Sequence, residues 1–364
     1  MKVGILGGGQ LARMIVLAGY PLDLEFIILD PSADAGAVGL GEHLHGQYDD
    51  PVLLAELAEK ADVVTYEFEN VPAGVAKFLQ EHTQVYPAPN ALAVAQDRLI
   101  EKDFFQQLNI PTAPYAAVDN LEDLQRVMDD IGYPAIIKSR RMGYDGKGQV
   151  VVKSSEQLPG AWEAMQGVAS IVEGFVSFQR EISIIAARRP SGEVVFYPIS
   201  ENDHDKGILR VSECRSGDQV QTQAEEIAVS LLDALDYVGI VAIELFDVDG
   251  ELVANEFAPR VHNSGHWTIE GSETSQFENH LRAILDLPLG STQARGYTGM
   301  VNFIGGIPTM ASVLEVANSH HHLYSKSPRK GRKVGHATVR ADSETACSQS
   351  LQQLIELAEE TDDS

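Results

Sequence analysis

A basic residue followed by a glycine-rich loop is the most informative chemical pattern in this sequence. Lys138 ends the apolar run 135–137, and five residues later the chain reads Gly143-Tyr144-Asp145-Gly146-Lys147-Gly148-Gln149. Glycines allow a loop to lay backbone N–H groups against phosphate oxygens, beside the positive charge of the lysine. A Walker loop is excluded, because it opens a helix and requires Ser or Thr where Gln149 stands. The pattern predicts another kind of nucleotide-phosphate site, with an ordinary glycine-rich hairpin loop as the alternative.

Two acidic residues on successive predicted strands indicate a metal site. Glu244 lies in the strand 238–248 and Glu256 in the strand 251–257, on either side of Asp249-Gly250. A two-residue turn sends these carboxylates to opposite faces, whereas a three-residue loop with glycine in a bulge places both on one face. We expect the three-residue loop and a shared Mg²⁺ that also grips nucleotide phosphates, since Mg²⁺ takes a few carboxylates plus phosphate and water. The alternative is a pair of solvated hairpin acids.

The loop after this hairpin is dense in hydrogen-bonding side chains. Arg260 can clamp an oxyanion with two parallel hydrogen bonds, and His262, Asn263 and His266 can donate or exchange protons in the same place. A loop this polar, directly after a buried strand, is typical of a site. Loop-capping hydrogen bonds are the alternative, because Asn, Ser and His are common turn formers.

Two further patterns are weaker. The segment Glu173-Gly174-Phe175-Val176 can offer backbone groups to an adenine edge, with Glu181 accepting from ribose hydroxyls, but a pair of core strands explains it better. The segment Gly7-Gly8-Gly9-Gln10-Leu11-Ala12, with Asp30 further on, matches a dinucleotide fingerprint. It is equally a phosphate cradle at a helix N-terminus.

The first segment of the chain alternates strands with helices. Strands are expected at 2–6, 26–29 and 63–66, with helical segments after the first glycines and near 51–60 and 72–79. Such alternation predicts a Rossmann-like parallel sheet with helices on both faces, and its ligands lie beyond the carboxyl ends of the strands. The residues at those ends are Gly7 to Gln10, Asp30 and Glu67 to Asn70.

The second segment changes to an α+β pattern with antiparallel strands. A helix at 91–108 leads into it, and a smaller third segment follows Pro288. The expected elements are helices at 121–131, 154–166 and 222–236, strands at 135–139 and 149–152, several strands within 170–215, and the hairpin 238–259. We therefore predict three domains, at residues 1–95, 96–289 and 290–364.

Composition excludes several classes of function. The chain has 364 residues, and 27 Lys and Arg against 53 Asp and Glu give a formal net charge of −26, which disfavours nucleic-acid binding. A small anionic substrate stays possible where Lys and Arg cluster in a cleft. Cys214 and Cys347 are too few for a disulfide framework, no signal peptide is recognisable and no apolar run approaches the ~20 residues needed to span a membrane. The cytoplasm is the expected compartment.

Read together, these segments resemble the ATP-grasp superfamily, in which a nucleotide lies between two α+β subdomains and activates a carboxylate as an acyl phosphate. Within it, they are similar to the 5-(carboxyamino)imidazole ribonucleotide synthases of purine biosynthesis. The similarity implies a fold that is α/β and α+β, with an N-terminal Rossmann-like domain, a central ATP-grasp domain of two subdomains and a small C-terminal domain. It extends to about residue 340 and is carried by the segments 7–14, 66–71, 96–98, 138–149, 255–260 and 331–336.

The resemblance implies an ATP site in the second segment, with Mg²⁺ or Mn²⁺ on Glu244 and Glu256. The residues that it assigns to ATP are Arg98, Lys138, Gly143, Tyr144, Asp145, Gly146, Lys147, Gly148, Gln149, Glu173, Gly174, Phe175, Val176, Glu181, His204, Asn255 and Glu256.

It also implies carboxylation of 5-aminoimidazole ribonucleotide on its exocyclic amine. ATP phosphorylates bicarbonate to carboxyphosphate, and the amine then captures the carboxyl carbon, which gives 5-carboxyamino-imidazole ribonucleotide, ADP and phosphate in de novo IMP synthesis. The ribonucleotide phosphate is expected at the helix start, and the residues around this substrate are Gly9, Gln10, Leu11, Glu67, Tyr144, Asp145, Lys147, Lys326 and Arg332.

The implied catalytic residues surround bicarbonate and the amine. Arg260, His262, Asn263 and His266 would hold bicarbonate and carboxyphosphate, and Asp145 would orient or deprotonate the amine. Lys147 completes the set, although many family members carry Arg there, and Lys lacks the bidentate fork. The family also suggests a homodimer. The partners expected are otherwise small molecules, with neither nucleic acid nor membrane.

Other classes account for part of the sequence. A formate-using glycinamide ribonucleotide transformylase shares the residues that bind ATP and the site for the phosphoribosyl group. A nicotinamide-dependent oxidoreductase fits Gly7 to Ala12 with Asp30 but leaves the residues 138–149 and 244–256 unexplained. A non-catalytic nucleotide-binding regulator is the third alternative.

Overall fold

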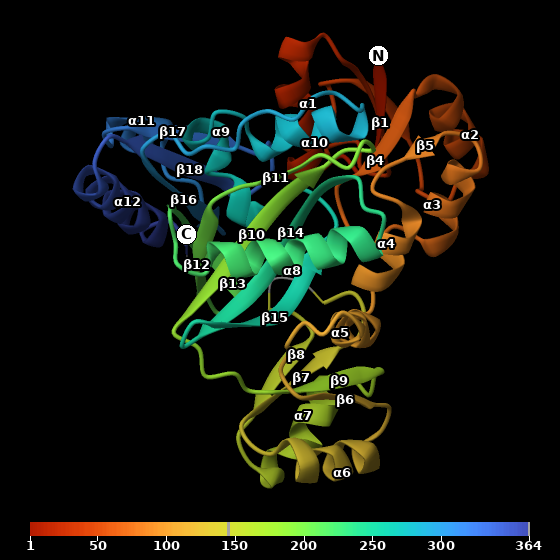
Figure 1. Ribbon diagram of the computed structural model, residues 1–364, viewed down its shortest axis with the longest axis vertical. Helices are drawn as coiled ribbons and strands as arrows, with labels where there is room; N and C mark the ends of the chain where they lie inside the picture. The colour runs from red at the N-terminus through yellow and green to blue at the C-terminus, as the bar shows by residue number, and fades with distance from the viewer. Residues whose placement is uncertain (144–145, 363–364) are drawn as a thin grey trace.

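The first part of the chain folds around a parallel sheet in the computed structural model, which describes residues 1–143 and 146–362 (Figure 1). Its strands are β1 (Lys2–Leu6), β2 (Glu25–Asp30), β3 (Glu42–His45), β4 (Val63–Tyr66) and β5 (Gln84–Val85), and its helices are α1 (Gln10–Gly19), α2 (Pro51–Lys60) and α3 (Ala73–Gln80). The strand order is β3-β2-β1-β4-β5 with parallel pairing throughout. The predicted Rossmann-like sheet is confirmed.

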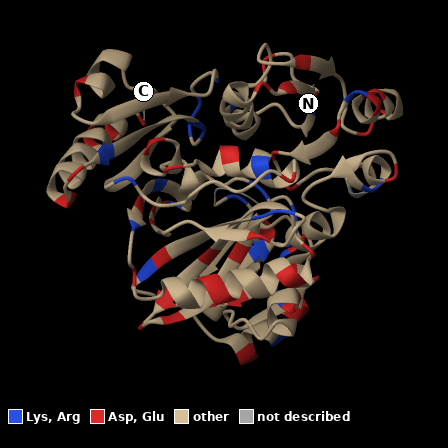
Figure 2. Ribbon diagram, turned by 45° about the horizontal axis from the view of Figure 1, so that its top comes forward, with Lys and Arg blue, Asp and Glu red and all other residues tan. Residues whose placement is uncertain are grey.

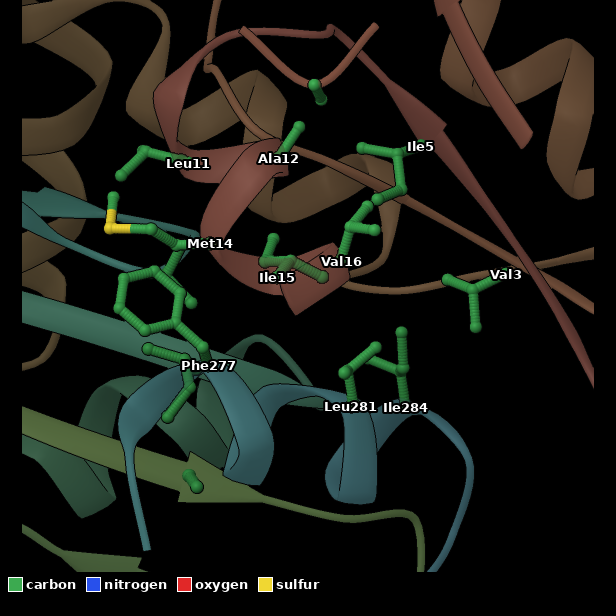
Figure 3. Packing of buried hydrophobic residues seen from close by; sticks show 14 of the residues in the cluster. Val3, Ile5, Leu11, Ala12, Met14, Ile15, Val16, Phe277, Leu281 and Ile284 are labelled. Atoms are coloured by element: carbon green, nitrogen blue, oxygen red, sulfur yellow. The ribbon is translucent and has the colours of Figure 1, made fainter. Parts of the chain in front are cut away.

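Helix α1 fixes this sheet to the centre of the molecule. Its apolar residues include Met14 and Ile15, and both are buried in one cluster with Phe277 and Leu281 of α10 (Gln276–Ile284) (Figure 3). The same cluster contains Val3 of β1, so α1 is covered by the sheet on one side and by α10 on another. A helix that is apolar on more than one face is stable only when it is buried in this way.

A second, antiparallel sheet lies in the lower part of the molecule in Figure 1, above the helices that cover it. It consists of β6 (Tyr115–Val118), β9 (Ser170–Gly174), β7 (Ala135–Ser139) and β8 (Gln149–Val152), in that order. Helices α6 (Leu121–Ile131) and α7 (Leu158–Ala164) pack on it. The strands that flank the glycine loop are therefore confirmed. The helix expected at 154–166 is shorter, because a 3₁₀ turn precedes it and Pro159 suits only a first helical turn.

The largest sheet has nine strands and continues from the centre of the chain to its end. Its order is β15-β14-β10-β12-β13-β16-β18-β17, with β11 paired to β10. The strands are β10 (Arg180–Arg188), β11 (Val194–Phe196), β12 (Ile199–Asp205), β13 (Ile208–Arg215), β14 (Gly239–Val248), β15 (Glu251–Ala258), β16 (Tyr297–Ile304), β17 (Ser319–Leu323) and β18 (Lys333–Ala341). Since β13 pairs with β16, the sheet crosses residue 290, and the predicted division into three domains stays a prediction.

The helices around this sheet cover it at two ends. Helix α8 (Gln221–Ala234) crosses the strands near β15, and α12 (Glu344–Glu359) lies beside β16 (Figure 1). Shorter helices are α9 (Thr268–Gly271) and α11 (Met310–Glu315). None of the described helices is both long and apolar enough to cross a membrane.

The single helix predicted at 91–108 is wrong. The chain forms α4 (Pro89–Ala95) and α5 (Arg98–Gln107), separated by Gln96 and Asp97. The carboxylate of Asp97 accepts the backbone N–H of Leu99 at 3.1 Å and therefore caps a new helix. This break places Arg98 in the first turn of α5, where it faces the cleft described below.

The turn predicted between Glu244 and Glu256 is also wrong, although their shared face is confirmed. Val248 pairs with Glu251, so the turn has two residues, Asp249 and Gly250, both with positive φ. The register shifts by one further along, because Leu245 pairs with Ala254 and Glu244 with Glu256. The extra residue is Asn255, which forms a β-bulge. The bulge, rather than the turn, brings both carboxylates to one face.

His280 joins the first sheet to the largest one. Its Nε2 lies 2.9 Å from Thr65 Oγ1 in β4, and its Nδ1 accepts the N–H of Ile240 at 3.2 Å in β14. Burial lowers the pKa of His280 to about 4. In the unfolded chain a histidine has a pKa near 6.5. Between about pH 6.5 and pH 4 the unfolded state therefore binds more protons than the folded state, and the free energy of unfolding falls as the pH falls through this range.

We expect the lowered pKa of His280 to reduce the free energy of unfolding by about 2 kcal/mol when the pH falls from 7 to 5. His280→Gln cannot be protonated there, so its unfolding free energy should depend less on pH by that amount. Urea unfolding at both pH values measures the difference, with His320→Gln as a control at an exposed histidine. The same pH dependence in wild type and His280→Gln would contradict this account.

Candidate functional site

A polar cleft of about 800 Å³ lies where the three sheets approach one another. Figure 2 shows acidic segments over the outer helices and strands, and several basic segments towards the middle of the molecule. The cleft brings together most of the residues predicted from sequence. Those that line it are Gln10, Leu11, Glu67, Arg98, Lys138, Gly143, Gly146, Lys147, Gln149, Phe175, Glu181, His204, Glu244, Asn255, Glu256, Arg260, His262, Asn263, His266, Lys326 and Arg332.

A few predicted site residues lie elsewhere. Gly9, Gly148, Glu173, Gly174 and Val176 are not among the lining residues of the cleft. Tyr144 and Asp145 lie outside the described residues. The carboxylate of Glu173 is buried behind the cleft, where its Oε2 accepts from Lys138 Nζ at 3.0 Å. Glu173 therefore contacts a cleft residue without facing the cleft itself.

Glu244 and Glu256 form a carboxylate pair on one face of the sheet. Arg98 Nη1 donates to Glu256 Oε2 at 2.6 Å, and His262 Nε2 lies 3.4 Å from Glu244 Oε1. Burial and the charge of Glu256 raise the pKa of Glu244 to about 7. Burial also acts to raise the pKa of Glu256, but Arg98 and Lys138 outweigh it and lower that pKa. The two carboxylates are close enough for the charge of Glu256 to act on Glu244, and this pair of oxygen donors suits a divalent cation.

Lys138 lies at the end of β7 and is 8% exposed. Besides the contact of Lys138 with Glu173, Lys102 Nζ of α5 lies 3.4 Å from the same carboxylate oxygen. Two lysines therefore share one carboxylate oxygen at this end of the cleft. A buried positive charge next to an open polar cleft is suited to a phosphate group.

The loop after β15 lines the cleft and is held in place by contacts of its own side chains. Arg260 Nη2 lies 2.5 Å from Glu69 Oε1 of the first segment, and His262 Nδ1 lies 2.8 Å from Ser264 Oγ. Asn263 Nδ2 donates to Asn302 at 3.1 Å. Both interpretations of this loop therefore apply, since the side chains that face the cleft are also held by local hydrogen bonds.

The two histidines of this loop are neutral in the structure. Burial, then the charges of Arg260 and Lys333, lower the pKa of His262 to about 3. His266 is 1% exposed, and burial also lowers its pKa. Its Nδ1 has no hydrogen-bond partner among residues 1–143 and 146–362. This buried nitrogen therefore has hydrogen-bonding capacity that the described residues do not use.

The start of α1 is occupied by carboxylates of the chain itself. Glu67 accepts the N–H groups of Gly9 and, at 2.9 Å, of Ala12. Asp30 accepts from Gly8 N at 2.7 Å and from Tyr48 Oη at 2.9 Å. The groups that a dinucleotide would use are thus already bonded, so the dinucleotide interpretation is not supported, and the Gly9 N–H is not open to a substrate phosphate in this structure.

Sequence reasoning missed several lining residues. Phe178 and Phe246 stack with ring centroids 4.7 Å apart and line the cleft, as does Phe175. Arg329 and Lys333 line it beside Lys326 and Arg332. Residues 326–333 contain five Lys and Arg residues, and this basic stretch is a local pattern sufficient to indicate Arg329 and Lys333. The aromatic pair and the contact between Glu69 and Arg260 join distant segments, and no local pattern marks them.

This architecture defines the class of ATP-grasp ligases. A glycine loop on a small antiparallel sheet faces a carboxylate pair on a larger antiparallel sheet, and a Rossmann-like segment closes the remaining side. Family models match accordingly: a ribonucleotide synthetase preATP-grasp domain at residues 1–96, an ATP-grasp domain at 103–277 and a phosphoribosylaminoimidazole carboxylase C-terminal domain at 298–350.

Individual relatives narrow the class to one family. An N5-carboxyaminoimidazole ribonucleotide synthase of Pseudomonas aeruginosa is 51% identical over 93% of this chain and 94% of its own length. A crystal structure of the synthetase from Thermus thermophilus matches with a TM-score of 0.93 and 51% identity over 98% of each chain. A structure from Aspergillus clavatus, in complex with ADP and 5-aminoimidazole ribonucleotide, matches with a TM-score of 0.91 and 32% identity over 99% of this chain and 98% of that one.

The chain belongs to the family of N5-carboxyaminoimidazole ribonucleotide synthases. These are ATP-binding ligases of purine biosynthesis, so the predicted resemblance and the enzyme class are confirmed.

Proposed function

We propose that this chain uses ATP and bicarbonate to carboxylate the exocyclic amine of 5-aminoimidazole ribonucleotide. The observation that carries the proposal is one continuous cleft in which Arg98, Lys138 and the pair Glu244 and Glu256 adjoin the donors of the loop 260–266. Phosphoryl transfer needs positive charge and positioning at one point, and carboxyphosphate needs donors and exclusion of water at the next.

ATP is proposed to lie between the two antiparallel sheets. Its adenine would contact the aromatic residues Phe175, Phe178 and Phe246, and Glu181 would accept from the ribose, beside His204 at 2.9 Å. Its phosphates would meet Arg98, Lys138 and the glycine loop. The other residues that we retain for ATP are Gly143, Gly146, Lys147, Gly148, Gln149, Gly174, Val176 and Asn255, together with Tyr144 and Asp145, which lie outside the described residues.

Gly146→Ala is expected to weaken ATP binding roughly tenfold. Gly146 has a φ of +72°, and an added Cβ would lie 2.7 Å from the backbone oxygen of Lys206, so the loop would have to move. Calorimetric titration with ATP measures the effect. Gly160→Ala is the matched control, because no atom lies within 4 Å of its added Cβ. Equal ATP affinity in wild type and Gly146→Ala would contradict a role for the loop.

Mg²⁺ is proposed to bind Glu244 and Glu256, and Mn²⁺ can replace it. No three His, Cys, Asp or Glu side chains converge as a metal site within the described part of the chain. This donor set fits Mg²⁺, which takes one or two carboxylates and completes its shell with water and substrate phosphates. The buried Oδ1 of Asn255, which has no partner among the described residues, adds a neutral oxygen beside the pair. When bound, the ion neutralises charge on the transferred phosphoryl group.

Bicarbonate is proposed to lie at the loop after β15. Arg260 and the amide of Asn263 would bind its oxygens, with His262 and His266 as neutral partners. The ribonucleotide would occupy the end of the cleft formed by Gln10, Leu11 and Glu67. Because Glu67 already holds the Gly9 N–H, we place the substrate phosphate on the basic stretch with Lys326 and Arg332, while Lys147 closes over it.

Asp145 keeps its proposed role of orienting or deprotonating the amine. Asp145→Asn is expected to lower carboxylation by roughly 10²-fold, the scale of general-base catalysis, and to leave ATP affinity nearly unchanged. Product formation and ATP titration measure the two effects separately. Unchanged turnover would exclude this role.

ADP release is the assay that tests the function as a whole. We expect ADP release to require both bicarbonate and 5-aminoimidazole ribonucleotide. One molecule of carboxylated product should form for each molecule of ADP released. Release that depends on formate and glycinamide ribonucleotide would favour the transformylase, and ATP binding without turnover would favour a regulator. A homodimer and a cytoplasmic location are further proposals, and sedimentation tests the first.

A further inference from the structure

Lys102 is a buried lysine that has no role in the reaction proposed above. It lies on α5, one turn after Arg98, and is 1% exposed. Its Nζ donates to the carbonyl oxygens of Asn255 at 2.7 Å and Ala254 at 3.3 Å. Burial of an ammonium group is unfavourable unless the group is paired and hydrogen-bonded. Burial lowers the pKa of Lys102, and the charge of Glu173 acts in the opposite direction, so the ammonium group depends on the partners around it.

The carbonyl groups that Lys102 binds belong to the bulge at Asn255. A bulge leaves backbone groups of the extra residue without a partner on the neighbouring strand, and Lys102 supplies donors to them. The adjacent Glu101 accepts the N–H of Phe257 at 2.7 Å. Without the bulge, the two-residue turn would send Glu256 to the face opposite Glu244. Successive residues of α5 therefore hold the feature that aligns the carboxylate pair.

Lys102 also acts on the phosphate end of the cleft through Glu173. Glu173 Oε2 lies 3.4 Å from Lys102 Nζ and 3.0 Å from Lys138 Nζ. While both lysines are charged, Glu173 neutralises only one of the two charges. Without the charge of Lys102, Glu173 would neutralise Lys138 fully and weaken its attraction for phosphate.

We propose that Lys102 is a positioning residue that couples the two halves of the nucleotide site. Its hydrogen bonds to the bulge set the direction of Glu256, and its contact with Glu173 sets the charge available at Lys138. The inference rests on the proposed roles of Glu256 at the metal and Lys138 at the phosphates. Lys102 itself lies outside the residues that line the cleft.

Two variants separate the two contributions. Lys102→Met keeps much of the volume but removes both the donors and the charge, whereas Lys102→Gln keeps an N–H donor and loses the charge. ADP is titrated calorimetrically into each variant without Mg²⁺ and with saturating Mg²⁺. Lys102→Met should bind ADP roughly tenfold more weakly and lose most of the gain in affinity that Mg²⁺ gives. Lys102→Gln should also bind more weakly without Mg²⁺ but keep more of that gain.

Lys153→Met is the matched control, because Lys153 is exposed after β8. Thermal unfolding reports stability in parallel. A lower Tm for Lys102→Met with unchanged ADP affinity and an unchanged Mg²⁺ gain would reduce Lys102 to a purely structural residue and overturn the proposal. If Lys102→Met does not fold, the titrations of Lys102→Gln decide. These titrations need no turnover, so an inactive wild type would refute the proposed carboxylation separately.

Discussion

Replacement of Glu256 by glutamine is expected to lower kcat/KM for ADP formation by roughly 10²- to 10³-fold, the range for loss of one group that stabilises developing charge. Glu256 pairs with Glu244 across β14 and β15 and lies 2.6 Å from Arg98. Glutamine keeps the size of the side chain but removes its charge. At the proposed Mg²⁺ site the ion would then lose a ligand, and Arg98 loses its carboxylate partner. Initial rates over a range of Mg²⁺ concentrations should show a higher requirement for the ion.

A control on the same strand separates this effect from general damage to the hairpin. Glu251 begins β15 and is exposed, so Glu251→Gln should keep nearly wild-type rates. Glu244→Gln should resemble Glu256→Gln. The double variant should be less impaired than the product of the two single effects, because residues that act as a unit are not additive. A wild-type Mg²⁺ requirement in Glu256→Gln would remove this residue from the metal site.

Local patterns were sufficient for the strands that carry the carboxylates but not for their register. The sequence predicted both strands of the hairpin, and Asp249-Gly250 predicted a turn between them. The bulge at Asn255 has no local signature, because the group that satisfies its carbonyl is Lys102, which lies 153 residues earlier in the chain. The shared face was predicted correctly, but the turn proposed as its cause was not.

The same distinction applies to the site. The glycine loop and the loop after β15 were predicted because each gathers its chemical groups within about ten residues. The binding of Glu67 to the N-terminus of α1 was not predicted, because Gly9 and its acceptor Glu67 are 58 residues apart in the sequence. Helix starts attract anions in general, and here a carboxylate of the chain itself is the anion. A motif therefore identifies a binding group, whereas only the fold shows whether that group is already used.

Lys138→Met is expected to lower kcat by roughly 10²- to 10³-fold, since in the proposed ATP site it removes a fixed charge from the place where phosphoryl charge would develop. Lys138 is 8% exposed and ends β7 beside the cleft, and methionine retains most of its apolar stem. Glu173 keeps Lys102 as a partner at 3.4 Å, so no buried carboxylate is left unpaired. The variant should therefore fold, and its loss should lie in catalysis and ATP affinity rather than in stability.

Single-turnover measurements with saturating ATP separate the chemical step from binding. If Lys138 stabilises the transferred phosphoryl group, the rate of ADP formation stays low at saturation in Lys138→Met, and Lys138→Arg recovers part of it because the charge returns with a different geometry. If Lys138 only attracts ATP, saturation restores the rate and the assignment to catalysis fails. A large fall in Tm for Lys138→Met would instead show that Glu173 depends on Lys138 more than on Lys102. Lys138 would then be the main partner that stabilises the buried carboxylate of Glu173.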